Sequence, residues 1–131
     1  MLTDPKKAYL NTRATSSVHN ASPHKLILLL LEACQENLAI AKGAIGRKDV
    51  KLKAESIKKA IEIVVRLQSI LDFEKGGSVA QRLDDLYNFC TNRLALANAA
   101  NDTECVDQVY KVIAEIKAGW IEIGEEITDV R

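Results

Sequence analysis

Histidine and glycine are the residue types in this chain whose positions bear most directly on chemistry. The two histidines are His19, in a polar N-terminal stretch, and His24, directly after a proline. Neither has the Glu-x-x-His spacing of a di-iron centre in a helical bundle, and neither lies in mid-helix, where a phosphotransfer histidine would be exposed. Gly76 and Gly77 are too short a run for a phosphate-binding loop and lack a following Lys-Ser or Lys-Thr. We therefore expect these glycines to form a sharp helix-to-helix turn.

The cysteines give no indication of a metal site or a disulfide framework. Cys34, Cys90 and Cys105 are odd in number and have no Cys-x-x-Cys spacing. Because Cys34 and Cys90 lie within apolar helical patterns, we interpret them as small buried hydrophobic residues in a reducing cytosol. Adjacent carboxylates such as Asp84 and Asp85 point about 100° apart on a helix and make no catalytic pair. We therefore expect no enzyme, no metal and no cofactor.

The charges of the chain are balanced. Lys and Arg total 18 and Asp and Glu total 18, so the formal net charge is zero. This removes the excess positive charge from which nucleic-acid binding draws its affinity. The longest apolar run, residues 26–31, is far shorter than the roughly 20 residues of a membrane span. No apolar stretch near the N-terminus resembles a signal peptide. These features predict a cytoplasmic protein without nucleic-acid binding or membrane insertion.

Capping and turn residues divide the chain into an arm and four helices. Residues 1–21 are mostly polar, and we expect them to form an N-terminal arm or a short extra helix. Ser22 with Pro23, Asp49 and Ser78 are typical of helix starts, and Asp102 or Thr103 can cap the last helix. The predicted helices span residues 23–45, 50–71, 79–100 and 103–127. Their similar lengths and short connections predict an all-α fold, an antiparallel up-down four-helix bundle over residues 22–131.

Apolar residues at helical spacing define the predicted core. The stripe of the first helix comprises Ile27, Leu30, Leu31, Cys34, Leu38, Ala41 and Ile45. That of the second comprises Ile57, Ile61, Val64, Gln68 and Leu71, helped by Val50, Ala54 and Val65. That of the third comprises Val79, Leu83, Leu86, Cys90, Leu94 and Ala97. That of the fourth comprises Val106, Val109, Ile113, Ile116, Trp120 and Ile127, and we interpret its tryptophan as a core anchor.

Further large apolar residues lie off these stripes. On the second helix, Ile63, Leu67 and Ile70 fall roughly 120–140° from the centre of the predicted core face. The others are Leu26, Leu29 and Ile40 on the first helix, and Phe89 and Leu96 on the third. Each such side chain, if exposed, forgoes about 1.5–3 kcal/mol of burial. The cluster indicates a partner-binding groove, a splayed bundle in which these residues face a neighbouring helix, or a homodimer interface.

A series of short motifs carries a family resemblance. The motifs are Ala21-Ser22-Pro23-His24-Lys25-Leu26-Ile27, Leu71-Asp72-Phe73-Glu74-Lys75-Gly76-Gly77, Leu86-Tyr87, Arg93-Leu94, Ala97-Asn98 and a late Trp120. In this order and spacing they resemble the flagellar secretion chaperone family (FliS), and the likeness covers Tyr9 to about Ile123. The chain departs from the family pattern at Glu32-Ala33, where an acidic-glycine pair is usual. It departs again at Asn88-Phe89-Cys90, where Asp-Tyr-Met is common.

The resemblance implies a helical bundle that binds the disordered C-terminal segment of flagellin, prevents its premature polymerisation and aids its delivery to the flagellar export gate. It also implies an N-terminal arm that can lie over an apolar groove, with a tyrosine matching Tyr9. The expected partner-binding residues are Tyr9, Leu10, Leu26, Leu29, Ile63, Leu67, Ile70, Phe89 and Leu96. The alternative is a structural homo-oligomeric helical bundle, which would form a tight dimer in solution.

Overall fold

Four long helices make up the part of the chain that the structure describes. The computed structural model describes the backbone of residues 22–130 and the side chains of residues 22–124. It contains α2 (Pro23–Arg47), α3 (Val50–Ser69), α4 (Phe73–Ala100) and α5 (Thr103–Val130), with no strand among the described residues. The predicted all-α class is therefore confirmed. The division at residue 22 between an arm and the bundle stays a prediction, because residues 1–21 lie outside the described range.

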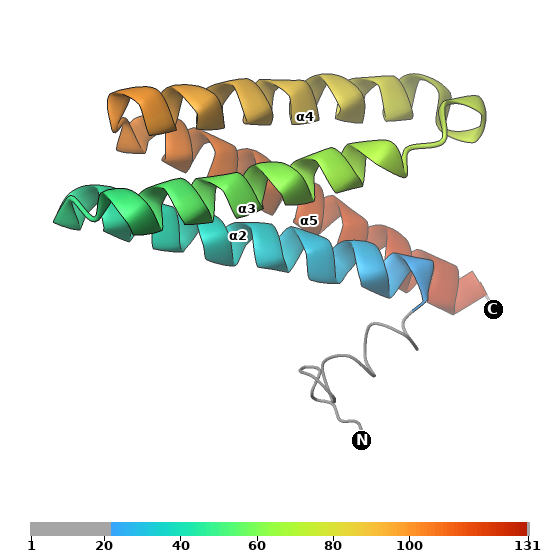
Figure 1. Ribbon diagram of the computed structural model, residues 1–131. Helices are drawn as coiled ribbons and strands as arrows, with labels where there is room; N and C mark the ends of the chain where they lie inside the picture. Colours follow the sequence, from blue (N-terminus) through green and yellow to red (C-terminus); the bar gives the residue numbers. More distant parts are fainter. Residues whose placement is uncertain (1–21, 131) are drawn as a thin grey trace.

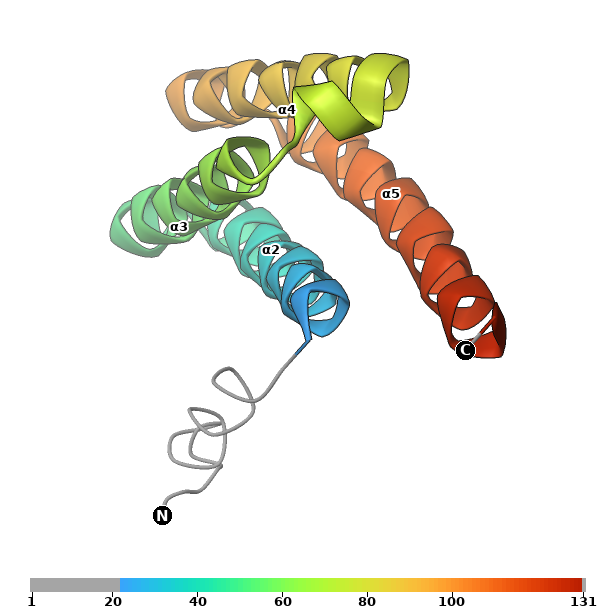
Figure 2. The same cartoon turned by 90° about the vertical axis from the view of Figure 1, so that its right-hand side faces the viewer.

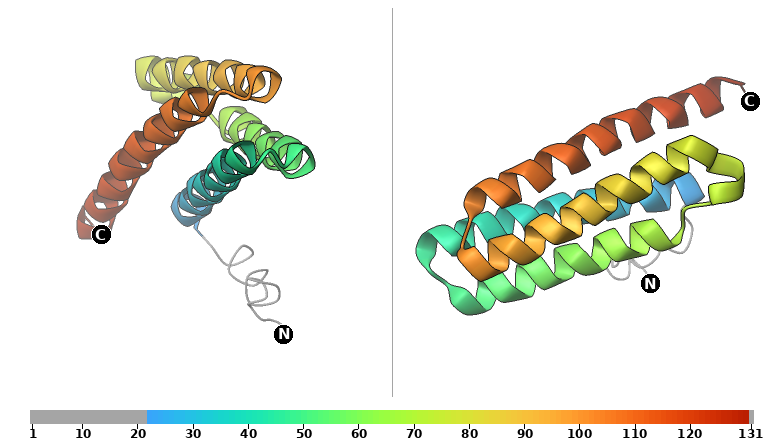
Figure 3. Two further views of the ribbon diagram at one scale, coloured as in Figure 1. Left: turned by 90° about the vertical axis from the view of Figure 1, so that its left-hand side faces the viewer. Right: turned by 90° about the horizontal axis from the view of Figure 1, so that it is seen from above.

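The helices run alternately up and down, as Figures 1 and 3 show. Contacts join α2 to α3 and α5, and join α4 to α3 and α5, so the four helices form a ring. Short connections at residues 48–49, 70–72 and 101–102 force each helix to run antiparallel to the one before it. The fold is thus the predicted antiparallel bundle.

Three of the predicted helix caps are present. The Asp102 carboxylate accepts a hydrogen bond, 2.9 Å long, from the backbone N–H of Glu104, the second residue of α5. The Ser22 hydroxyl and the Asp49 carboxylate each accept a hydrogen bond, 3.1 Å long, from the backbone N–H three residues further on. These bonds satisfy donors that the first helical turn leaves without intrahelical partners. At the other end of α2, Lys48 and not Gly46 adopts the left-handed conformation, with φ 60°. The helix is therefore longer than the predicted 23–45, while α3 ends at Ser69, short of the predicted residue 71.

The main part of α4 follows a kink at Gly77, where the sequence predicted a helix-to-helix turn and a start near Ser78, but a short helical turn from Phe73 precedes the kink. Asp72 caps this turn and accepts a backbone N–H at 3.0 Å. Gly77 then interrupts the helix with φ 51° and ψ −127°, a conformation that residues with a side chain rarely adopt. A Cβ on Gly76 would lie 2.8 Å from the Cβ of Ala80. The two glycines thus allow an extra turn to fold back closely before the main part of α4.

Most of the buried core lies in one half of the bundle, which we call the closed half. This half contains the α2–α3 and α4–α5 connections. Leu31 and Leu67 extend the core towards the opposite half. The core residues are Leu31, Cys34, Leu38, Ala41, Ile57, Ala60, Val64, Leu67, Tyr87, Cys90, Leu94, Ala97, Cys105, Val106, Val109 and Ile113. The opposite half, which we call the open half, contains the start of α2, the α3–α4 connection and the second half of α5. There α5 diverges from α4 (Figures 2 and 3).

The exposures of five apolar residues contradict the predicted core stripes. Leu67 was expected off the core face, but it is only 2% exposed. Because α3 contacts both α2 and α4, its buried arc is wider than one stripe. Val50, Ala54, Val65 and Val79 were expected to help form the core, but all are exposed, Val50 by 68% and Val79 by 66%. Val50 is the first residue of its helix, while Val79 lies where the bundle opens.

The buried cysteines confirm their interpretation as small hydrophobic residues. Cys34, Cys90 and Cys105 are all buried and free. Burial raises the pKa of the Cys90 thiol to about 12. Burial, with a smaller contribution from Cys90, also raises the pKa of the Cys34 thiol to about 12. Both thiols therefore stay protonated and unreactive at neutral pH.

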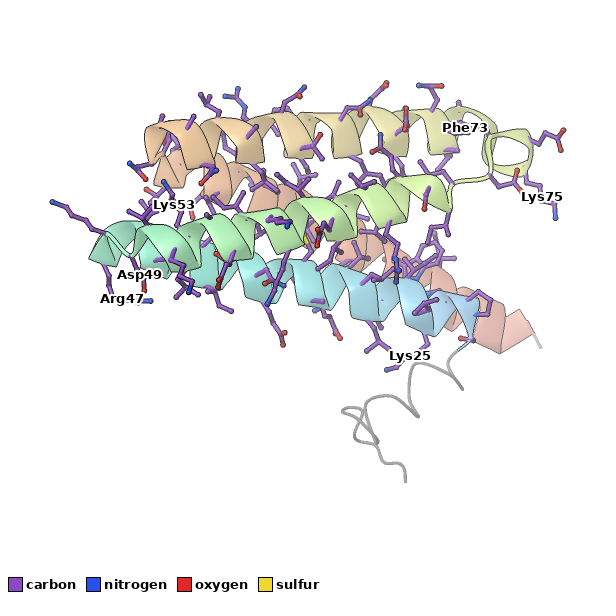
Figure 4. All side chains as sticks on the ribbon, viewed as in Figure 1. Lys25, Arg47, Asp49, Lys53, Phe73 and Lys75 are labelled. Atoms are coloured by element: carbon purple, nitrogen blue, oxygen red, sulfur yellow. The ribbon has the colours of Figure 1, made fainter. Side chains whose placement is uncertain are left out.

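A buried lysine joins α3 to the end of α4. Lys53 is 8% exposed, and its Nζ donates to the Asn98 carbonyl oxygen at 3.0 Å and to Asn101 Oδ1 at 2.6 Å. Figure 4 places Lys53 at the closed half, near Arg47 and Asp49. Its positive charge complements the partial negative charge at the C-terminal end of α4. It thereby satisfies carbonyl groups that the helix leaves without partners.

Candidate partner-binding groove

The helices separate in the open half and leave an apolar groove of about 770 Å³, which we call the open-end groove. Its lining comes from all four helices and from the α3–α4 connection. The lining residues are Ile27, Leu67, Ile70, Leu71, Asp72, Lys75, Gly76, Val79, Ala80, Leu83, Tyr87, Ile116, Trp120 and Ile123. Among these, only Asp72 and Lys75 carry a charge. A cleft of this size falls within the roughly 300–1,000 Å³ of typical ligand-binding sites.

One wall of the groove continues the core stripe of α5. Val109 and Ile113 are fully buried in the closed half. Ile116, Trp120 and Ile123 follow at the same helical spacing, but they line the groove. At this level α4 has diverged from α5, while α2 stays in contact with it through His24 and Trp120. A single apolar stripe on α5 therefore forms core first and then a wall of the groove.

The opposite side is formed by the α3–α4 connection and the extra turn of α4. Ile70, which is 48% exposed, and the largely exposed Val79 lie on this side. Phe73, also exposed, and Lys75 project from the same turn, as Figure 4 shows. The Asp72 cap and the Gly77 kink give this turn its shape. Several apolar side chains therefore lie in water beside an apolar groove, which is typical of a protein-binding site.

The groove contains no chemistry suited to catalysis. Tyr87 is its buried phenol, and burial, with smaller contributions from Cys90 and Cys34, raises the pKa of Tyr87 to about 12. The ring therefore stays neutral at physiological pH. Within the side chains that the structure describes, no group of three His, Cys, Asp or Glu residues could hold a metal ion. The arrangement suits the binding of an apolar surface.

A smaller and more polar groove of about 440 Å³ runs between α2 and α3. We call it the α2–α3 groove. It is lined by Leu30, Asn37, Lys59, Glu62, Ile63 and Arg66. Its charged rim and small apolar floor distinguish it from the open-end groove.

The structure brings only part of the predicted site together. Leu67 and Ile70 line the open-end groove, whereas Ile63 lines the α2–α3 groove. Leu26 and Leu29 are half-buried on α2, and Phe89 and Leu96 are exposed on α4; none of these four lines either groove. The guanidinium of Arg93 lies 5.3 Å from the ring centroid of Phe89 and covers part of it. Tyr9 and Leu10 lie outside the described residues.

Sequence reasoning missed most of the groove because its walls have the pattern of a core. Ile27, Leu83, Ile116 and Trp120 were all predicted to be core residues, and they do pack partly against the core. Periodicity finds the apolar face of a helix but not the point along it where the neighbouring helix departs. The one local signal was Gly76-Gly77 after a capping aspartate, which marks the turn where the groove begins.

Comparison with known proteins gives an independent indication. A family model described as "Flagellar protein FliS" matches residues 5–127. The flagellar secretion chaperone FliSB of Pseudomonas aeruginosa is 41% identical over 87% of this chain and 90% of its own length. The flagellar secretion chaperone FliS of Vibrio cholerae is 37% identical over 92% of this chain and 88% of its own. FliS of Salmonella typhimurium is 36% identical over 90% and 88%, respectively.

These relatives are named as chaperones, which agrees with the prediction that the chain is not an enzyme. Among the described residues, no helix is both long and apolar enough to cross a membrane. The chain belongs to the FliS family of flagellar secretion chaperones.

Proposed function

We propose that this protein is a cytoplasmic export chaperone that holds the C-terminal segment of flagellin in the open-end groove. The observation that carries this proposal is the groove itself, an apolar cleft of about 770 Å³ with exposed side chains along one edge. Its near absence of charge selects a partner with a continuous apolar face. An export chaperone needs a client of this kind, and flagellin is the client implied by the motifs of the sequence.

The geometry supports a partner that becomes helical on binding. An amphipathic helix lays apolar side chains one turn apart into a groove between helices. A disordered segment would become ordered in the same step, which lowers its affinity per unit of buried area but keeps it releasable. While bound, its apolar face is covered and cannot assemble with other flagellin molecules. Release at the export gate would then free it for assembly.

The remaining predicted contacts extend the proposal beyond this groove. Ser22 directly precedes α2, whose Ile27 lines the groove, so Tyr9 and Leu10 belong to a segment that enters the described fold at the open half. We propose that this segment competes with flagellin for the groove. Ile63 offers a second contact in the α2–α3 groove, and Leu26, Leu29, Phe89 and Leu96 offer further ones on the outer surface.

A matched pair of valine substitutions tests the proposed binding site. Val79 and Val50 have nearly equal exposures, 66% and 68%, but only Val79 lines the open-end groove. Neither Val79→Asp nor Val50→Asp should unfold the protein, because both carboxylates can remain in water. We expect Val79→Asp to weaken binding of a flagellin C-terminal peptide by roughly tenfold or more, because a bound helix would desolvate the charge. Val50→Asp should bind as the unchanged protein does.

Isothermal titration calorimetry provides the measurement. The unchanged protein should bind one peptide per chain with a negative heat-capacity change, which marks the burial of apolar surface. Absence of binding by the unchanged protein at high micromolar concentration would refute the proposal. If Val79→Asp binds the peptide normally but converts a dimer to a monomer, the groove is a self-interface and the homo-oligomeric alternative is correct.

A further inference from the structure

His24 and Trp120 form a reciprocal contact between the start of α2 and the second half of α5. The His24 ring nitrogen Nε2 donates to the backbone carbonyl oxygen of Trp120 at 2.6 Å, since a carbonyl can only accept. The indole Nε1–H of Trp120 donates in return to the His24 carbonyl oxygen at 2.9 Å. The two rings are stacked, with centroids 4.7 Å apart and planes 9° from parallel. Two hydrogen bonds and a stacking contact therefore fix one ring against the other.

A glycine on α5 makes room for the imidazole. A Cβ placed on Gly124 would collide with the His24 ring. The ring therefore lies against the α5 backbone one turn beyond Trp120. Gly119, on the same helix, has open space where its Cβ would be. The two glycines thus have different surroundings, although each lowers the helix propensity of α5.

The contact lies beyond the fully buried part of α5, where Ile116 and Trp120 are only partly buried against the core. Ile113 is the last fully buried residue of α5 within its described side chains, which end at Gly124. Between Ile113 and Trp120, the amine of Lys117 reaches α2 through long bonds to Glu32, at 3.4 Å, and to Gln35, at 3.3 Å. Both are partly exposed and therefore weak. The Trp120 indole packs partly against the core and lines the open-end groove, and its Nε1–H is held by the His24 carbonyl oxygen.

We propose that His24 is a positioning residue that fixes the Trp120 indole as one wall of the open-end groove, and so sets the affinity of the groove for an apolar helix. His24 itself is absent from the groove lining and acts through Trp120. The inference rests on the proposed function, since it concerns the affinity of the same groove. It adds the requirement that the wall be held in place before the partner arrives, because a preformed wall lowers the ordering cost of binding.

The test uses the only tryptophan of the chain as its reporter. In His24→Ala, the Trp120 fluorescence should become more accessible to quenching by acrylamide, and a flagellin C-terminal peptide should bind roughly five- to thirtyfold more weakly. His24→Phe keeps a ring for stacking, and His24→Gln keeps a donor for the Trp120 carbonyl. Each should restore part of the lost affinity and part of the protection from quenching. A residue that only stabilised the fold would not show this parallel recovery.

Gly124→Ala and Gly119→Ala form a second, matched test. Both substitutions favour the helix, so neither should lower its stability strongly. Gly124→Ala must push the imidazole away from α5, and it should expose Trp120 to acrylamide and weaken peptide binding as His24→Ala does. Gly119→Ala should change neither quenching nor binding. Lys42→Ala removes a 2.9 Å ion pair to Asp107 between the same two helices in the closed half, and it should also leave both unchanged.

The outcomes separate this inference from the proposed function. If His24→Ala and Gly124→Ala expose Trp120 but bind the peptide as the unchanged protein does, or if neither exposes Trp120, the positioning role is wrong. If the unchanged protein fails to bind the peptide, the proposed function is wrong. The positioning role is then decided by titration with the apolar dye ANS, whose binding His24→Ala should weaken and Gly119→Ala should not. Equal dye binding by all variants would overturn it.

Discussion

The closed and open halves of the bundle are built from the same four helices with the same apolar periodicity, but one half forms a packed core and the other forms a groove. In the closed half, where α5 packs against α2 and α4, Val109 and Ile113 of α5 are fully buried. In the open half, Ile116 and Trp120 of the same stripe line a groove of about 770 Å³. The difference lies in helix separation and not in residue type. The groove is therefore a continuation of the apolar core face into the half of the bundle where the helices separate.

The first prediction separates two residues that sequence reasoning treated alike. Leu67 is 2% exposed and Ile70 is 48% exposed, although both line the groove. Leu67→Asp places an unpaired carboxylate in the core and should lower the free energy of unfolding by about 3–5 kcal/mol. Ile70→Asp should leave the fold intact and weaken peptide binding. Thermal melts followed by circular dichroism decide this, and equal melting temperatures would remove the distinction between the two positions.

The second prediction compares two isoleucines on the α5 stripe. Ile113→Ala creates a cavity in the closed half and should lower the free energy of unfolding by about 2–5 kcal/mol. Ile123→Ala, at a position already 45% exposed, should cost less than about 1 kcal/mol. Urea denaturation of both variants provides the measurement. A cost at Ile123 as large as that at Ile113 would mean that the open half is packed as tightly as the closed half.

The fold was largely predictable from local sequence, because helix caps and periodicity are local. Ser22, Asp49 and Asp102 were correctly predicted as caps, and the four helices were found. A helix-to-helix turn was correctly predicted at Gly76-Gly77, but the short helical turn that begins at Phe73 and precedes the kink at Gly77 was missed. Leu67 was misplaced because α3 contacts two neighbours. The site was less predictable, since Trp120 lines a groove only because α5 diverges, and that is a tertiary property.

The third prediction concerns alkaline pH and the closed half. The Cys34 and Cys90 thiols have an ordinary pKa of 9.0, which burial raises to about 12 in the fold. The unfolded chain therefore loses protons at a lower pH than the folded protein does. Stability should be constant below pH 9 and fall as pH rises from 9 towards 12, by about 1–3 kcal/mol at pH 10. Urea denaturation from pH 7 to pH 10 measures this.

The control for the alkaline effect is the double variant Cys34→Ala, Cys90→Ala. It is less stable at pH 7 because two buried side chains are shortened. Its stability should nevertheless fall less steeply above pH 9 than that of the unchanged protein. Parallel curves for the two proteins would show that the thiols are not the groups responsible.

The fourth and smallest effect is expected at Lys53, in the closed half. Lys53→Met keeps most of the apolar stem but removes the bonds to Asn98 and Asn101, and it should cost about 1–2 kcal/mol. Peptide binding should be unchanged, because Lys53 lies away from the open-end groove. Denaturation and calorimetry on the same preparation test both parts. Weaker peptide binding without a loss of stability would indicate that the binding site lies in the closed half and not in the open half, as proposed.

Hydrogen–deuterium exchange of the protein, free and bound to the flagellin C-terminal peptide, tests the central claim most directly. The account predicts that binding slows exchange in the open half, in residues 67–83 and 116–124, where the groove lies. Exchange in the closed half, around Leu38, Ile57 and Val106, should change little because these helices are already packed. Protection confined to the closed half or to the outer face of α4 around Phe89 would contradict the account.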